Sequence, residues 1–135
     1  MGYDKNQLLK AIKEAEAYPG PSLVIGYAPC EMHSIKGGMT NCQNEMKKAV
    51  DCGYWNMFRF NPMNKAEGKN PFTMDSKAPV SEDYRAFIMN EARYSRLTAA
   101  FPERAEELFS KAEDTSVARY EHLLKLKDLY APDAE

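Results

Sequence analysis

The sequence predicts a small domain of the α/β class, and three observations indicate this class. A continuous apolar run, Leu23-Val24-Ile25, is too short to span a membrane and is typical of a strand buried on both faces. An amphipathic helical pattern precedes this run, and the turn Pro19-Gly20-Pro21 separates the two. Two further helical patterns fill the C-terminal part of the chain. Because the chain has 135 residues, we expect one hydrophobic core.

The first helix is expected to begin after Asp4. This aspartate is a suitable N-cap, and Gln7 follows three residues later, as in a capping box. Apolar side chains then recur at helical spacing at Leu8, Ala11, Ile12 and Ala15. The turn that follows stops the helix, because its prolines cannot donate backbone hydrogen bonds. Helix, turn and strand make half of an α/β unit.

The strand is expected over residues 22–28. Consecutive strand residues point to opposite faces, so an unbroken apolar run predicts that both faces are covered, as in a parallel sheet. Pro29 has no N–H to donate and ends the ladder. Cys30 is therefore expected at the carboxyl end of a strand, where open α/β sheets place their ligands.

A loop over residues 31–38 leads into a second predicted helix. Thr40 and Gln43 form a second capping-box pattern, and Gly53 is a natural stop. The apolar stripe between them consists of Met46, Ala49 and Val50. Residues 54–60 are rich in aromatic side chains with an alternating pattern, which predicts a second strand.

Residues 61–80 contain many Asn, Pro, Lys and Gly residues, and they predict an irregular segment around a brief strand at residues 72–74. Such a segment is best explained if it lies along another domain or subunit. Ser81 is expected to cap a helix, and Pro102 to open a last long one. The apolar stripe of the former helix runs through Tyr84, Phe87, Ile88, Glu91, Tyr94 and Leu97.

Composition narrows the classes of function. A net charge of −2 gives no broad basic field, so we expect no nucleic-acid partner. The three cysteines form no CxxC pair, and the N-terminal residues lack the charged and apolar regions of a signal peptide. These features favour a reducing, cytoplasmic setting, and we expect no membrane association.

Cys30 is the candidate for chemistry. A thiolate suits iron–sulfur clusters, zinc or nucleophilic attack, but no cysteine stands near Cys30 in the sequence to complete a site. The alternative interpretation is a small buried residue, as cysteine usually is. For Cys42 and Cys52 that structural interpretation is favoured, because their ten-residue separation puts them on different faces of an ideal helix.

Three other features have more than one interpretation each. His33 can be a base, a ligand or a loop hydrogen-bonder, and the last is favoured in the absence of a recognisable partner. Lys36-Gly37-Gly38 has the elements of an anion site but lacks the spacing of a Walker loop, which favours a glycine-permitted turn. The aromatic group of Tyr54, Trp55, Phe58 and Phe60 can stack on bases, yet in an acidic protein it is more typical of a core.

A series of uncommon short motifs follows in a fixed order along the chain. They are Leu23-Val24-Ile25-Gly26-Tyr27-Ala28-Pro29-Cys30, His33, Lys36-Gly37-Gly38-Met39, Gln43, Ala49-Val50, Gly53-Tyr54-Trp55, Phe58-Arg59-Phe60-Asn61-Pro62, Glu67-Gly68-Lys69-Asn70-Pro71-Phe72 and Asp75-Ser76-Lys77-Ala78-Pro79. With these motifs the sequence resembles the carboxyl-terminal part of the pyruvate:ferredoxin (flavodoxin) oxidoreductases. The resemblance covers nearly the whole chain and is strongest between Tyr18 and Pro79.

The resemblance implies a multidomain, usually dimeric, anaerobic enzyme that oxidatively decarboxylates pyruvate with coenzyme A to acetyl-CoA and carbon dioxide. Thiamine diphosphate with Mg²⁺ serves the decarboxylation, and electrons pass through 4Fe-4S clusters to ferredoxin or flavodoxin. The cysteine of the family's Tyr-Ala-Pro-Cys word is a ligand of the cluster nearest the thiamine, and it maps onto Cys30. Ser34 departs from the family, which commonly has glycine at this position.

The family's thiamine motif and its other cluster cysteines do not occur in this chain. We therefore expect a fragment of a thiamine-diphosphate-binding fold with few strands, a long irregular segment and C-terminal helices. Residues 1–62 would end the thiamine-binding α/β domain, residues 63–80 would form an extended linker, and residues 81–135 a helical extension. We expect no cofactor bound to the isolated fragment and no turnover by it. The remaining domains and a second subunit would be its partners.

Two alternatives remain at this stage. The chain is either a non-catalytic docking or interaction domain, or an independent thiol enzyme that uses Cys30 and His33. An upstream reading frame that carries the thiamine motif and the cluster cysteines would favour the fragment of the oxidoreductase, and an alkylation-sensitive activity would favour the thiol enzyme.

Overall fold

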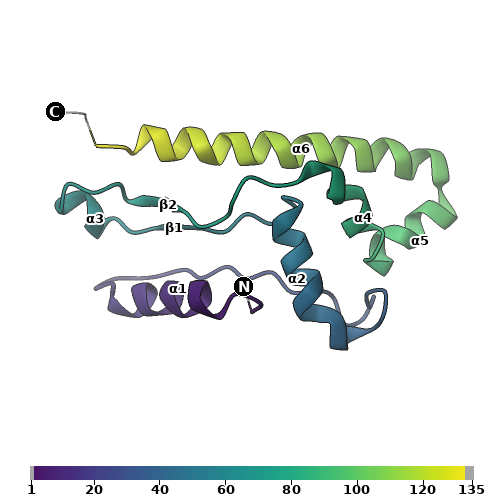
Figure 1. The fold of residues 1–135 in the computed structure, drawn as a ribbon, viewed down its shortest axis with the longest axis horizontal. Coiled ribbons are helices and arrows are strands. Elements are labelled where there is room, and N and C mark those ends of the chain that lie inside the picture. Colours follow the sequence, from purple (N-terminus) through teal and green to yellow (C-terminus); the bar gives the residue numbers. More distant parts are fainter. Residues whose placement is uncertain (1, 133–135) are drawn as a thin grey trace.

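The computed structural model describes residues 2–132, which form helices around a two-stranded antiparallel sheet. The helices are α1 (Lys5–Ala17), α2 (Cys42–Asp51), α3 (Met63–Ala66), α4 (Tyr84–Ile88), α5 (Ala92–Ala100) and α6 (Pro102–Leu129), with short 3-10 turns at Met39–Asn41 and Ser81–Asp83. The strands are β1 (Phe58–Phe60) and β2 (Phe72–Met74). Figure 1 shows an elongated molecule with α6 along one side, the strands in the middle and α1 on the other side. This mixture of helices and a small sheet is compatible with a piece of an α/β fold.

Several local predictions are confirmed. The Asp4 side chain accepts a hydrogen bond from the Gln7 backbone N–H and caps α1. Gly53 ends α2 with φ of 83°, a left-handed conformation that glycine adopts without a steric penalty. Pro102 stands in the first turn of α6. The brief strand at residues 72–74 pairs in register with β1, with Thr73 opposite Arg59.

The core lies where α2, α4 and α6 meet. Its buried side chains are Ala49, Cys52, Tyr84, Phe87, Ile88, Ala105 and Phe109. A smaller cluster of Met46, Val50 and Met57 connects α2 to the chain that enters β1. The predicted stripe of the second helix is therefore confirmed. Among the described residues α1 contributes no fully buried side chain, so this core does not depend on it.

A polar network attaches α1 to the sheet. The Arg59 guanidinium donates to both carboxylate oxygens of Asp75 at 2.7 and 2.9 Å and also to Glu14 of α1. The Gln7 side chain donates to Asp75 at 3.2 Å. Burial alone would raise the pKa of Asp75, but the hydrogen bonds from Arg59 and Gln7 outweigh it and hold this pKa below its ordinary value.

The prediction of a buried strand over residues 22–28 is wrong for the described chain. Residues 22–28 are extended but belong to no sheet, and Leu23, Val24 and Ile25 are 83%, 53% and 69% exposed. The physical reason is that no described strand pairs with this stretch, and the described residues leave its apolar side chains largely uncovered. The apolar run indicates that the segment is suited to burial on both faces, but no element within residues 2–132 covers both faces.

Three further predictions need correction. The helix predicted from Ser81 is broken, because Glu91 is extended (φ −86°, ψ 116°) and forms a β-bridge with Ile35. The capping box at Thr40 does not form, because a 3-10 turn with Gly38 at its N-cap precedes α2. The strand predicted over residues 54–60 is limited to Phe58–Phe60, because Tyr54 and Trp55 turn inward and pack against the core. None of the described helices is long and apolar enough to span a membrane.

Candidate functional site

Cys30 lies where the extended segment turns into the loop. Residues 31–33 form a turn that is closed by a 2.8 Å hydrogen bond from the Ser34 N–H to the Cys30 carbonyl. Ser34 has φ of 66°, in the left-handed region that disfavours residues with a Cβ atom. Glycine adopts this backbone conformation without the steric penalty that serine has, so Ser34 is less favourable here than glycine would be.

The turn brings His33 against the thiol. The Sγ atom of Cys30 and the Nδ1 atom of His33 are 3.1 Å apart, on an accessible part of the surface. Hydrogen bonding from the His33 backbone and then from its ring lowers the pKa of the Cys30 thiol below its ordinary value. The pair therefore favours a thiolate at Cys30, which is the form that binds metals and attacks electrophiles.

The loop is held to the junction between α4 and α5. Ile35 is buried and bridges Glu91, and the backbone N–H of Lys36 donates to the Asn90 carbonyl at 2.8 Å. The N–H of Ala92 donates to the Ser34 carbonyl at 3.2 Å. The loop is therefore positioned by residues almost sixty positions further along the chain, which no local sequence pattern indicates.

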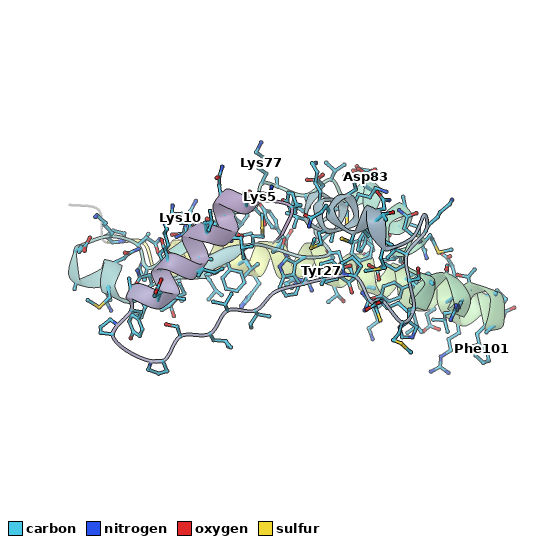
Figure 2. All side chains as sticks on the ribbon, turned by 90° about the horizontal axis from the view of Figure 1, so that it is seen from below. Lys5, Lys10, Tyr27, Lys77, Asp83 and Phe101 are labelled. Carbon is cyan, nitrogen blue, oxygen red and sulfur yellow. The ribbon has the colours of Figure 1, made fainter. Side chains whose placement is uncertain are left out.

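Tyr27 anchors the other side of the thiol. Its ring lies 5.9 Å from that of Trp55 in a stacked arrangement and 5.5 Å from that of Tyr54 in an edge-to-face arrangement. Its hydroxyl donates to the carboxylate of Glu91. Figure 2 shows Tyr27 near the middle of the molecule. Cys30 is thus held between two anchors, Tyr27 before it and Ile35 after it, and both contact Glu91.

Two buried carboxylates lie behind the loop, and no sequence pattern assigned a functional role to either of them. Glu45 and Glu91 are each 1% exposed. Glu91 pairs with Arg93 at 3.0 Å, whereas among the described residues Glu45 has only long contacts, to Lys48 at 3.7 Å and to the Asn90 amide at 3.5 Å. Their positions in the sequence could have indicated their burial. Glu91 interrupts the apolar stripe of the helix expected from Ser81, and Glu45 directly precedes Met46 in the apolar stripe of the second helix.

Burial raises the pKa of Glu45, and the nearby charge of Glu91 adds to this effect, while Lys48 and Asn90 oppose it. Burial also raises the pKa of Tyr27, and so does its hydrogen bond to Glu91. The phenol therefore stays protonated and remains a hydrogen-bond donor to the carboxylate.

The other candidate residues are not brought to Cys30. Gly37 and Gly38 have φ of 85° and 80°, which supports the interpretation of Lys36-Gly37-Gly38 as a glycine-permitted turn. Cys52 is buried in the core, where burial raises the pKa of its thiol to about 11. Cys42 begins α2 and is half-buried. Within residues 2–132 no group of three or more His, Cys, Asp or Glu side chains is arranged to hold a metal ion.

The four aromatic residues of the predicted second strand lie in two different environments. Tyr54 and Trp55 pack against the core, as predicted, but Phe58 and Phe60 are 47% and 48% exposed. Phe58 stacks on Phe72 across the two strands at 5.3 Å, and Phe60 meets Tyr130 of the C-terminal region edge-to-face at 5.1 Å. These contacts hold the sheet to itself and to the end of α6.

Comparison with known proteins found close relatives, although no family model matches the chain. The chain is 52% identical over 126 residues to a pyruvate-flavodoxin oxidoreductase of Enterobacter agglomerans, and 52% identical over 128 residues to the pyruvate:ferredoxin oxidoreductase of Moorella thermoacetica. These matches cover 93% and 95% of this chain. A mitochondrial pyruvate dehydrogenase [NADP(+)] of Euglena gracilis is 40% identical over 114 residues.

The chain is thus homologous, over nearly its whole length, to one segment of enzymes that oxidise pyruvate. More particularly, it is homologous to a segment of the pyruvate:ferredoxin and pyruvate-flavodoxin oxidoreductases, and the resemblance found in the sequence is confirmed. The chain spans about 11% of the length of these relatives.

Proposed function

We propose that this chain is one segment of a pyruvate:ferredoxin (flavodoxin) oxidoreductase, and that Cys30 is one thiolate ligand of a 4Fe-4S cluster in the complete enzyme. In the proposed reaction, pyruvate and coenzyme A give acetyl-CoA, carbon dioxide, a proton and two electrons. The electrons pass singly to ferredoxin or flavodoxin. Thiamine diphosphate with Mg²⁺ would be held by residues outside this chain.

The observation that supports this role is the accessible Cys30 thiol, with His33 lowering its pKa, inside the segment that is 52% identical to the relatives. A ligand must be deprotonated and must face outward to meet ligands from other segments. A 4Fe-4S cluster is held by four thiolates, so one accessible thiolate fits one of the four ligand positions. When bound, the cluster would supply one-electron transfer.

The residues of this chain would hold the ligand in place. Tyr27 and Ile35 fix the backbone on either side of Cys30, and His33 favours its thiolate. The imidazole of His33 beside the sulfur would also affect the reduction potential, because hydrogen bonds to cluster sulfurs tune it.

Iron analysis and electron paramagnetic resonance of the complete enzyme test the proposal. We expect Cys30→Ala to lose about four iron atoms per subunit and the signal of one cluster, together with most pyruvate-dependent reduction of ferredoxin. Cys42→Ala is the matched control, since it removes another half-buried thiol and should retain all clusters. A normal iron content in Cys30→Ala would overturn the proposed role.

The contact between Cys30 and His33 also fits a second candidate function, a nucleophilic thiol in an independent enzyme. Upstream sequence distinguishes the two. A continuous reading frame with the thiamine motif and the remaining cluster cysteines supports the oxidoreductase segment. An alkylation-sensitive activity of the 135-residue chain alone supports the thiol enzyme.

A further inference from the structure

Aromatic rings from separate parts of the chain form one contiguous group next to Glu91. Tyr27 is stacked on Trp55, with ring centroids 5.9 Å apart, and lies edge-to-face with Tyr54 at 5.5 Å. The rings of Tyr54 and Tyr94 are 6.3 Å apart, and their hydroxyls share a 2.7 Å hydrogen bond. Neighbouring rings at these separations interact directly. An electron can therefore pass along the group in steps of one ring, between Tyr27 and Tyr94, which is partly exposed on α5.

Tyr27 differs from Tyr54 in the group that accepts its hydroxyl hydrogen bond. The hydroxyl of Tyr27 donates to the carboxylate of Glu91, which is 1% exposed and has Arg93 at 3.0 Å from its other oxygen. The hydroxyl of Tyr54 is bonded to that of Tyr94, which is a much weaker base. A phenol that loses an electron becomes a strong acid, and its proton is best released to a base within hydrogen-bond reach. Glu91 is such a base, so Tyr27 is the tyrosine of this group that is most easily oxidised.

Packing alone does not account for this pair of hydroxyl and carboxylate. A phenylalanine in place of Tyr27 would keep both ring contacts and would bring no polar group to the core. Burial of a carboxylate costs free energy, and only hydrogen bonds or a paired charge offset this cost. The pair holds a proton donor against a buried proton acceptor, three residues before Cys30. Such an arrangement suits the transfer of a proton together with an electron.

We propose that Tyr27 and Glu91 form a one-electron redox site, which reacts with thiyl and oxygen-derived radicals that arise near Cys30. The oxidising radical takes one electron from the phenol, and the phenolic proton passes to the Glu91 carboxylate, which leaves a neutral tyrosyl radical beside a carboxylic acid. An electron from a reductant at the surface, such as ascorbate, then returns through Tyr94 and Tyr54, and the proton returns to the oxygen of Tyr27. The oxidant is thereby reduced at an aromatic ring and not at the Cys30 sulfur. This role uses no metal and is independent of the proposed cluster.

A ruthenium tris(bipyridine) complex attached to the Cys30 thiol supplies the oxidant at a defined place. In a Cys42→Ala background the complex is attached at Cys30 alone, because Cys52 is buried. A light flash with an external electron acceptor gives ruthenium(III), which takes one electron from the chain. We expect a tyrosyl radical in electron paramagnetic resonance, with a signal that narrows when the tyrosines are ring-deuterated. Tyr27→Phe should remove most of this signal and slow the reduction of ruthenium(III), whereas Tyr130→Phe, at a site that is 40% exposed, should change neither.

The destination of the proton is tested separately. When Glu91 accepts the proton, the rate of ruthenium(III) reduction does not depend on the buffer concentration and is lower in heavy water. When the solvent accepts it, as at an exposed tyrosine, the rate rises with the concentration of the buffer base. We expect the first behaviour in the original chain and the second in Glu91→Gln, because an amide accepts the hydrogen bond but is a far weaker base than a carboxylate. Circular dichroism verifies that each variant is folded.

An unchanged radical signal in Tyr27→Phe would overturn the proposal, because another ring would then be the electron donor. A rate that rises with buffer concentration in the original chain would also overturn it, because Glu91 would not be the proton acceptor. The original chain alone decides this second point, so it stands even if Glu91→Gln does not fold. A radical at Tyr27 that forms at a buffer-independent rate supports the redox site, whatever the iron content of Cys30→Ala in the complete enzyme.

Discussion

The hydroxyl of Tyr27 donates a hydrogen bond to the buried carboxylate of Glu91, across 64 residues of sequence. This bond attaches the end of the unpaired segment to the junction between α4 and α5. The same glutamate pairs through its backbone with Ile35, on the other side of Cys30. Glu91 is therefore the residue on which the position of the thiol depends most directly.

Replacement of Tyr27 by Phe is expected to destabilise the chain. The variant keeps the ring contacts with Tyr54 and Trp55 but deprives a buried carboxylate of its hydroxyl donor, which costs about 1–3 kcal/mol. Urea denaturation measures the loss. Tyr130→Phe is the control, because Tyr130 is 40% exposed and its hydroxyl makes no hydrogen bond among the described residues. Equal stability of the two variants would contradict the importance of the bond.

Glu45 is expected to give the stability of the chain a pH dependence. Its pKa is raised in the folded chain, so its contribution is fully present below its ordinary value of 4.5 and is lost as the pH rises through the folded value. At pH 7 an ionised Glu45 is a buried charge with only distant partners. We therefore expect Glu45→Gln to raise the free energy of unfolding at pH 7 and to flatten its decrease between pH 4 and 7.

Urea denaturation across that pH range measures the effect of Glu45. The groups that face its carboxylate are Lys48, Asn90 and Glu91. Glu107→Gln is the control, because Glu107 lies on the exposed surface of α6 and its replacement should leave the profile unchanged. A Glu45→Gln profile identical to that of the original chain would show that Glu45 is not the group responsible.

Cys30 is expected to be the most reactive thiol of the chain. Because contact with His33 lowers the pKa of Cys30, a larger fraction is thiolate at pH 7, and iodoacetamide should modify it first. Burial raises the pKa of Cys52 to about 11, so Cys52 should stay unmodified while the chain is folded. His33→Ala should slow the modification of Cys30 by about 3–10-fold.

Peptide mass spectrometry follows the three cysteines in one sample. The rate at Cys42 serves as the internal control and should not respond to His33→Ala, since the structure describes no contact between the two residues. An unchanged rate at Cys30 in that variant would contradict the assigned effect of the imidazole.

Gly53 is expected to tolerate no side chain. Its φ of 83° disfavours any other residue, and an added Cβ atom would lie 2.9 Å from Pro79 and 3.3 Å from the Ser116 hydroxyl. Gly53→Ala should lower the free energy of unfolding by about 2 kcal/mol. Gly26→Ala is the matched control, because nothing lies within 4 Å of its added Cβ, and its effect should stay within about 0.5 kcal/mol. Thermal or urea unfolding compares the pair.

Short-range patterns predicted short-range structure in this chain. The cap at Asp4, the stop at Gly53, the start at Pro102 and the brief strand at residues 72–74 are all confirmed. The cap, the stop and the start depend on hydrogen bonds or steric preferences among residues that are close in sequence. The strand at residues 72–74 also needs its pairing with β1. The family resemblance is confirmed by relatives for a similar reason, since it is carried by the order of the residues themselves.

Tertiary structure alone decided what lies around the thiol. The break at Glu91, the burial of Glu45 and the bond from Tyr27 all join segments far apart in sequence, and no local pattern specifies such partners. The apolar run of residues 22–28 is the instructive case, because its sequence predicts a buried strand while its structure is exposed. Whether a segment is buried depends on the elements packed around it. An apolar sequence pattern indicates only that the segment is suited to burial.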